Sequence, residues 1–165
     1  MGRHCLAVAQ LLKAAVASVK AGVSSEDMAA AAMLHDYGKI FWPRDLFYKD
    51  KQDLSLHDLE VIASHPHVGR RLVALRWLEC PETVLRLVES HHSPEGWLPA
   101  QLLAACDVWV ACHEDRPYRT SAMPEKVILR EMLRVAPESV VGLVTNVSRN
   151  NLVGLTATEL NTISF

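Results

Sequence analysis

The chain has 165 residues, half of them hydrophobic, and a formal net charge of -2. This length suffices for one domain with a substantial core. The charged residues form no basic patch of the kind that binding to duplex nucleic acid requires, so we exclude a duplex-binding protein. The four cysteines contain no C-x-x-C pair and lie in apolar segments, which predicts reduced thiols in a cytoplasmic protein.

An apolar run near the N-terminus follows Arg3 and is interrupted by Lys13. The run is too weak for export and too short to cross a membrane, so it predicts an amphipathic helix rather than a leader or an anchor. This helix begins almost at Met1, with no capping segment before it. We interpret the chain as one that starts earlier in nature, or as a domain of a longer protein.

A second helix is predicted to begin at Ser24 or Ser25, because S-S-E-D before an alanine run is typical of a capped N-terminus. We expect it to run to His35 and to be stopped by Gly38. Residues 39–54 form a looser segment.

A serine cap at Ser55 predicts a third helix, and we expect Pro66 to divide it from a fourth. Each remaining helix is expected to start at a proline, namely Pro81, Pro99, Pro124 and Pro137. No segment shows the alternation of a strand. The sequence therefore predicts an all-α single domain over residues 1–165.

Asp107 is the only charged residue between positions 102 and 112, in an otherwise apolar helix. An isolated Asp of this kind usually faces solvent or caps a neighbouring helix. The alternative is a metal ligand, because a cation offsets the cost of removing a carboxylate from water.

His35 and Asp36 are adjacent at the end of the second predicted helix. Neighbours on a helix point about 100° apart, so both reach one ion only where the backbone turns, and we expect Gly38 to supply that turn. Four more histidines lie at helix ends or beside apolar runs: His4, His65, His91 and His92. Any one of them alone would usually be a cap or a hydrogen-bonded core residue. Three others have charged neighbours and are interpreted as solvent-facing: His57, His67 and His113. Mixed imidazole and carboxylate donors suit Fe, Mn, Zn or Ni better than calcium, and they leave room for water.

These residues form an ordered series of motifs: H-D-Y-G-K at 35–39, H-P-H-V-G at 65–69, H-H at 91–92 and D-R-P-Y-R at 115–119. With His4 and Asp107, the series covers about residues 4–120. It resembles the HD superfamily of metal-dependent phosphohydrolases, and more closely its HD-GYP branch. The resemblance implies a helical bundle with a five-helix metal-binding core, which the C-terminal helices of this chain would extend.

The resemblance also implies one or two divalent transition-metal ions (Fe, Mn, Zn or Ni), with ligands that follow from the motifs. The first ion would be held by His4, His35, Asp36 and Asp107. The second ion, which Asp36 would bridge, would be held by His65, His91 and His92. Lys39 would face a phosphate oxygen, and Arg116 would contact the substrate. The ordinary alternative for Lys39 is a solvated side chain after a helix.

One segment departs from the HD-GYP branch. Members of that branch carry a loop with the signature D-G-x-G-Y-P after the paired histidines, whereas this chain has only SPEGWLPAQ at 93–101. In the branch, the loop shapes the pocket for cyclic di-GMP and recruits partner domains. The N-terminal stretch that supplies a ligand to a third ion in some relatives is also missing here, so a trinuclear centre is not expected.

The leading functional hypothesis is a phosphohydrolase or phosphodiesterase that acts on a nucleotide, with cyclic di-GMP as a candidate substrate. Asp36 and Lys39 would act at the reacting phosphate, where a metal-activated water attacks. The alternative is a catalytically inactive HD-type regulatory or signalling module, which the deleted loop favours and the two candidate ligand carboxylates oppose. A di-iron oxygenase is a more distant third hypothesis.

Residues 123–165 carry no motif, and their amphipathic segments predict core packing, with a homodimer surface as the alternative. The expected partners are a phosphorylated small molecule or cyclic nucleotide and, by analogy with the branch, a fused signalling domain.

Overall fold

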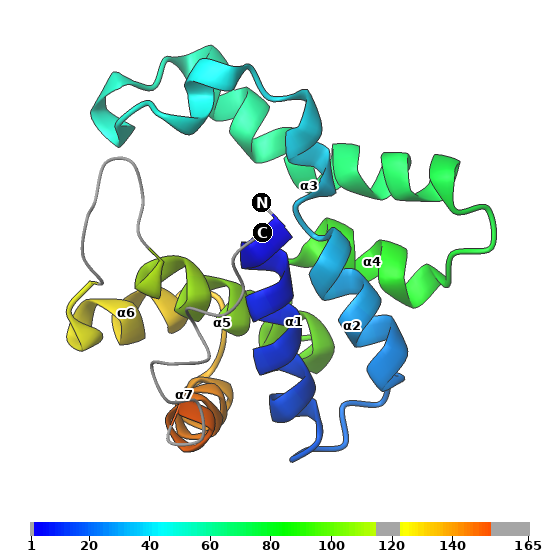
Figure 1. The fold of residues 1–165 in the computed structure, drawn as a ribbon, viewed down its shortest axis with the longest axis vertical. Coiled ribbons are helices and arrows are strands. Elements are labelled where there is room, and N and C mark those ends of the chain that lie inside the picture. The colour runs from blue at the N-terminus through cyan, green and yellow to red at the C-terminus, as the bar shows by residue number, and fades with distance from the viewer. Residues whose placement is uncertain (1, 115–122, 153–165) are drawn as a thin grey trace.

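The computed structural model describes residues 2–114 and 123–152 of the chain (Figure 1). The helices of this part are α1 (Gly2–Val16), α2 (Ser25–Leu34), α3 (Leu56–Arg76), α4 (Glu82–Ser90), α5 (Leu98–His113), α6 (Glu125–Met132) and α7 (Glu138–Leu152). Three short 3₁₀ helices join α2 to α3, namely η1 (Tyr37–Phe41), η2 (Arg44–Phe47) and η3 (Lys51–Asp53). No strand occurs among the described residues, which confirms the all-α class.

The core lies where α1 packs against α2, α5 and α7, and where α4 packs against α2 and α3. Figure 1 shows α3 crossing above the other helices, with α4 running back beneath its C-terminal half. The largest fully buried apolar side chains include Leu12, Leu87, Leu102, Leu103, Ile128 and Met132. The last two belong to α6, so the C-terminal helices contribute to the core as predicted. Burying side chains of this kind is the dominant favourable contribution to folding.

Two predicted helix caps are present. The Ser24 side chain accepts a hydrogen bond from the backbone N–H of Asp27, at the start of α2. Ser55 forms a capping box with Asp58 at the start of α3, in which each side chain accepts from the other residue's backbone N–H. Each cap satisfies backbone donors that the first turn leaves without helical partners.

The prediction that Pro66 divides two helices was wrong, because α3 runs without interruption from Leu56 to Arg76. Proline inside a helix usually costs about 3 kcal/mol, in part because it cannot donate to the carbonyl four residues earlier. Here the carbonyl oxygen of Ile62 accepts a hydrogen bond of 2.6 Å from Nδ1 of His65 instead. The side chain before the proline therefore provides the donor that the proline lacks.

The expected role of Gly38 was also wrong. Helix α2 ends at Leu34, before Gly38, and Gly38 is not among the described glycines with a positive φ. Gly38 lies in η1, and its backbone packs on α3 so closely that a β-carbon would come within 2.1 Å of the carbonyl oxygen of His65. The absence of a side chain therefore permits a close approach between η1 and α3, and it does not terminate a helix.

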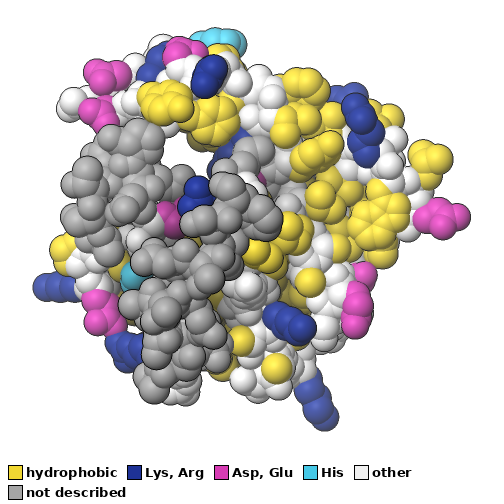
Figure 2. Space-filling view, viewed as in Figure 1, with side chains coloured by type: hydrophobic (Ala, Val, Ile, Leu, Met, Phe, Trp, Pro, Cys, Tyr) yellow, Lys and Arg dark blue, Asp and Glu magenta, His cyan; other side chains and the backbone are white. Residues whose placement is uncertain are grey.

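The surface has an apolar area over the side where α3 and α4 lie, as Figure 2 shows. Large exposed side chains near the end of α3 are Leu75, Trp77 and Leu78. Among residues 2–114 and 123–152, no helix has both the length and the apolar character needed to cross a bilayer.

Candidate metal centre

The candidate ligands come from three helices and from the turns that follow two others. His4 lies in the first turn of α1, and His35 and Asp36 directly follow α2. His65 lies in α3 and Asp107 in α5, while the pair His91 and His92 directly follows α4. The packing of these helices brings together every metal ligand that the sequence suggested, in groups whose donor atoms lie within 4.8 Å of one another.

The first group consists of His4, His35 and Asp107. Asp107 Oδ1 lies 2.9 Å from His4 Nε2 and 3.7 Å from His35 Nε2. The carboxylate thus faces two imidazole nitrogens from two other helices. Asp107 is therefore paired with His4 inside the site and does not face solvent.

The second group consists of His65, His91 and His92. The Nε2 atoms of His65 and His91 lie 3.2 Å apart, while Nδ1 of each ring faces a backbone carbonyl oxygen that can only accept. In the neutral rings, two nitrogen lone pairs therefore face each other. Two nitrogens that each bind one ion at about 2.1 Å lie about as far from each other as these two Nε2 atoms do. The pair therefore fits a shared cation.

Asp36 lies between the two groups. Its Oδ1 atom is 3.6 Å from Nε2 of His35 and 3.5 Å from Nε2 of His65. The carboxylate is buried and is paired with Lys39, whose Nζ lies 2.6 Å from Oδ1 and 2.7 Å from Oδ2. The Lys39 ammonium also lies 5.2 Å from the centre of the Trp42 ring, a distance at which a cation is attracted to an aromatic face.

Backbone carbonyls orient three of the histidines. Nδ1 of His35 donates to the carbonyl oxygen of Ala32 at 2.8 Å, and Nδ1 of His91 donates to that of Val88 at 2.7 Å. These carbonyls belong to the last turns of α2 and α4, where helical donors are absent. His65 uses the carbonyl of Ile62 in the same way. In all three rings, Nε2 is left as the atom that faces the centre, as metal-ligating histidines require.

The charges in the site favour a cation. Burial by itself raises the pKa of Asp107, but His35 and His4 hold it well below its usual range. Burial also raises the pKa of Asp36, but His65, His35 and Lys39 together lower it by more. Burial alone would lower the pKa of His35, yet Asp107 and Asp36 raise it. A position that attracts a proton to His35 attracts a metal ion for the same reason.

The second group differs, because burial holds the pKa of His91 well below its usual value, and the neighbouring His92 and His35 act in the same direction. His91 is therefore neutral and has a lone pair to offer. Together, the donor set and the charge of the site fit divalent transition metals.

The family model of the HD domain matches residues 1–132. The chain belongs to the HD domain family. Its adjacent His35 and Asp36 lie at the centre of the two ligand groups. The HD domain is typical of metal-dependent phosphohydrolases, in agreement with the predicted class. No curated protein matches the chain in sequence.

Two residues near the HD centre were missed by sequence reasoning. Glu114 Oε2 lies 3.0 Å from Nδ1 of His4 and thus contacts the side of the ring opposite Asp107. The buried Cys5 forms a third group of candidate ligands with His35 and Asp36. Cys5 follows His4 directly, but an apolar stretch gave no signal that its thiol faces a site. Arg116, the predicted substrate contact, lies outside the described residues.

The three histidines that were assigned no role lie apart from the ligand groups and are exposed. His67 Nδ1 lies 3.0 Å from Glu89 Oε1 at the surface. His57 and His113 are exposed as well. The distinction between helix-end histidines in apolar surroundings and histidines with charged neighbours therefore separates the two sets.

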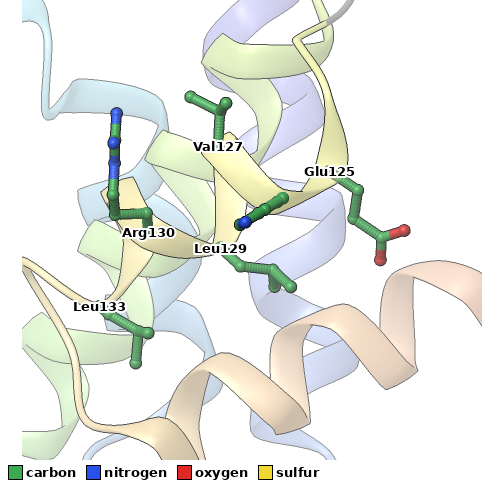
Figure 3. Close-up of a pocket in the computed structure, with 6 residues that line it drawn as sticks. Glu125, Val127, Leu129, Arg130 and Leu133 are labelled. Carbon is green, nitrogen blue, oxygen red and sulfur yellow. The ribbon is translucent and has the colours of Figure 1, made fainter.

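Two hollows lie near the C-terminal helices of the HD domain. One, of about 440 Å³, is lined by His92, by residues of the 93–101 connection and by Arg134. The other, of about 650 Å³, lies along α6 and is drawn in Figure 3 with Glu125, Arg130 and Leu133 among its lining residues. Its lining includes no member of the ligand groups, so we assign it no part in the chemistry.

Proposed function

We propose that this HD domain is a hydrolase with two metal ions, acting on a phosphate ester of a nucleotide. The observation that supports this most is the position of Asp36 Oδ1, which lies at similar distances from His35 Nε2 and His65 Nε2. These nitrogens belong to separate ligand groups, so one carboxylate lies between the two. A shared carboxylate is the arrangement expected of a bridging ligand in a two-ion centre.

Bound divalent ions would polarise a phosphoryl oxygen and lower the pKa of a coordinated water. The residues of the chain then have distinct parts. Asp36 and Asp107 supply negative charge to the ligand groups, and the histidines present Nε2 to them. Since Nδ1 of each of His35, His65 and His91 is bonded to a backbone carbonyl, these rings serve as fixed donors and not as proton carriers.

Lys39 is the residue that we assign to the phosphate. Its Nζ is beside Asp36, and its side chain is about one-fifth exposed, so it can reach a group that enters from solvent. A positioned ammonium stabilises the negative charge that develops on phosphate oxygens in the transition state. The Trp42 ring helps to hold it there.

The hollow beside His92 supports a substrate larger than a single phosphate group. Gln101 and Arg134 offer polar contacts in it, and the short 93–101 connection forms part of its wall. We assign this hollow to the sugar and base of the nucleotide. The H-P-H-V-G motif favours a cyclic dinucleotide such as cyclic di-GMP and membership of the HD-GYP branch, with the signature loop deleted.

The test is hydrolysis by the protein loaded anaerobically with Mn²⁺ or Fe²⁺. Substrates would be cyclic dinucleotides, nucleoside mono- and triphosphates, and a chromogenic phosphodiester. We expect the wild type and His67→Ala to hydrolyse the same member of the panel, and Asp36→Asn to lose this activity. His67 is a matched control because it is an exposed histidine outside the ligand groups.

An alternative, an inactive signalling module, would be supported by a loaded protein that binds a cyclic dinucleotide and releases no product from any substrate. In that case the hydrolase proposal is wrong.

A further inference from the structure

Cys5 lies at the candidate metal centre without a role in the chemistry described so far. Its Sγ, a nitrogen of His35 and an oxygen of Asp36 lie within 4.8 Å of one another. Cys5 lies in the first turn of α1, and the residue is only 4 % exposed. Cys80 and Cys106, by contrast, belong to none of the ligand groups that the described residues form.

A second observation at the same place concerns His35, which is fully buried. Its Nδ1 donates to the carbonyl of Ala32, and its Nε2 has no hydrogen-bond partner among the described residues. The nearest carboxylate oxygens lie 3.6 Å and 3.7 Å away, beyond hydrogen-bond length. A buried polar atom without a partner is unusual and requires an explanation, such as an ion that the atom binds.

The three donors complement one another chemically. A thiolate is a soft ligand, the His35 imidazole is intermediate, and the Asp36 carboxylate is hard. Zn²⁺, Co²⁺ and Fe²⁺ accept this mixture, whereas Mg²⁺ prefers oxygen donors alone. Cys5 follows His4 in the first turn of α1, and the two side chains belong to different ligand groups that share His35.

We propose that Cys5 Sγ is an additional ligand of the ion that His35 and Asp36 hold. This inference rests on the metal centre of the proposed function, and it extends the donor set from nitrogen and oxygen to sulfur. Binding forms one sulfur–metal bond and releases the thiol proton to solvent, with no change of oxidation state. The thiolate makes the centre more selective for zinc, cobalt and iron than a set of imidazoles and carboxylates would be.

The test uses cobalt and zinc as probes. Co²⁺ bound to a thiolate absorbs in the near ultraviolet through sulfur-to-metal charge transfer, which nitrogen and oxygen ligands do not produce. We expect this band in the wild type and in Cys80→Ser. We expect Cys5→Ser to bind Co²⁺ without the band. Cys80 is a suitable control because it is partly buried and lies outside the ligand groups.

A measurement on the wild type alone guards against a variant that fails to fold. X-ray absorption of the zinc-loaded protein should contain a zinc–sulfur distance of about 2.3 Å besides the shorter distances to nitrogen and oxygen. Bound metal with only nitrogen and oxygen neighbours, or a band that persists in Cys5→Ser, would overturn the role of Cys5 and leave the proposed hydrolase standing. Failure of the wild type to take up either metal would overturn both.

Discussion

The backbone of Gly38 lies directly against the carbonyl oxygen of His65. A β-carbon at Gly38 would come within 2.1 Å of this oxygen and 2.8 Å of the backbone nitrogen of Gly69. This contact joins the turn that follows Asp36 to the helix that carries His65. The two ligand groups are therefore positioned relative to each other by a contact between two backbones.

Gly38→Ala should destabilise the protein, because the atoms in the way are backbone atoms that cannot rotate aside. We expect a loss of about 3 kcal/mol in the free energy of unfolding, at the upper end of the range for overpacked cores, together with weaker metal binding. Chemical denaturation measures the first effect and metal titration the second. Gly142→Ala is the control, since nothing lies within 4 Å of the added carbon and alanine favours the helix. Equal stabilities for the two variants would contradict the role of the contact.

Removal of metal should lower the stability of the wild type. An ion present at about 100 times its dissociation constant stabilises the folded state by about 2.7 kcal/mol, if it does not bind the unfolded chain. Thermal unfolding with and without a chelator measures this increment. The increment should vanish in Asp107→Ala and persist in His67→Ala. An increment of the same size in Asp107→Ala would exclude this carboxylate as a ligand.

Lys39→Ala should separate metal binding from catalysis. Its ammonium pairs with the Asp36 carboxylate, so removing it should leave metal affinity unchanged or raise it. The rate of hydrolysis should fall by about 100-fold, because charge on the phosphate oxygens loses its partner. Metal titration and kcat are the two measurements. Lys49→Ala serves as the control, because Lys49 pairs with Asp45 and Asp58 and not with a ligand. Loss of bound metal in Lys39→Ala would assign a structural role to the lysine.

Asp58 should make the stability of the protein depend on acid pH. Hydrogen bonds from Ser55 and then Lys49 lower the pKa of Asp58 to about 2 from its ordinary value of 3.8. A carboxyl group with a lowered pKa in the folded state stabilises the protein above its ordinary pKa, and this contribution is lost as the pH falls through the folded-state value. The difference in unfolding free energy between wild type and Asp58→Asn should therefore shrink between about pH 4 and pH 2.

The control for this measurement is Asp53→Asn, at an exposed carboxyl group. A difference between wild type and Asp58→Asn that stays constant over the acid range would contradict the assignment to the α3 cap.

Much of the fold follows from local sequence signals. Ser24 and Ser55 mark helix starts because a capping hydrogen bond spans only three residues, and such contacts are visible in the sequence. The ligand histidines share a local feature as well, since each was found beside an apolar run or at a helix end. That these histidines gather around Asp36 could be predicted only from the order of the motifs, because the apolar periodicity does not tell which helix ends lie together in the fold.

The errors concern residues whose role depends on distant contacts or on an unusual local one. The effect of Pro66 depends on whether another donor reaches the carbonyl of Ile62, and a histidine side chain does so here. Gly38 appeared to be a helix terminator, although its importance comes from a helix that begins 18 residues later in the chain, at Leu56. Whether the Cys5 thiol faces the site depends on how α1 is rotated about its axis. This rotation could not be predicted from the adjacent His4.

The carbonyl groups that hold His35, His65 and His91 have a consequence for how the chain acquires its metal. Each ring is oriented only after its own helix has formed, because an unwound turn would withdraw the carbonyl. The eight histidines of an unfolded chain would instead rotate freely and offer either nitrogen. Full coordination would therefore be available only from the completed bundle, so we expect metal loading to follow folding. Once bound, the two ions would link the ends of α2 and α4 to α3, and the fraying of these helices would be slowed for as long as the ions stay.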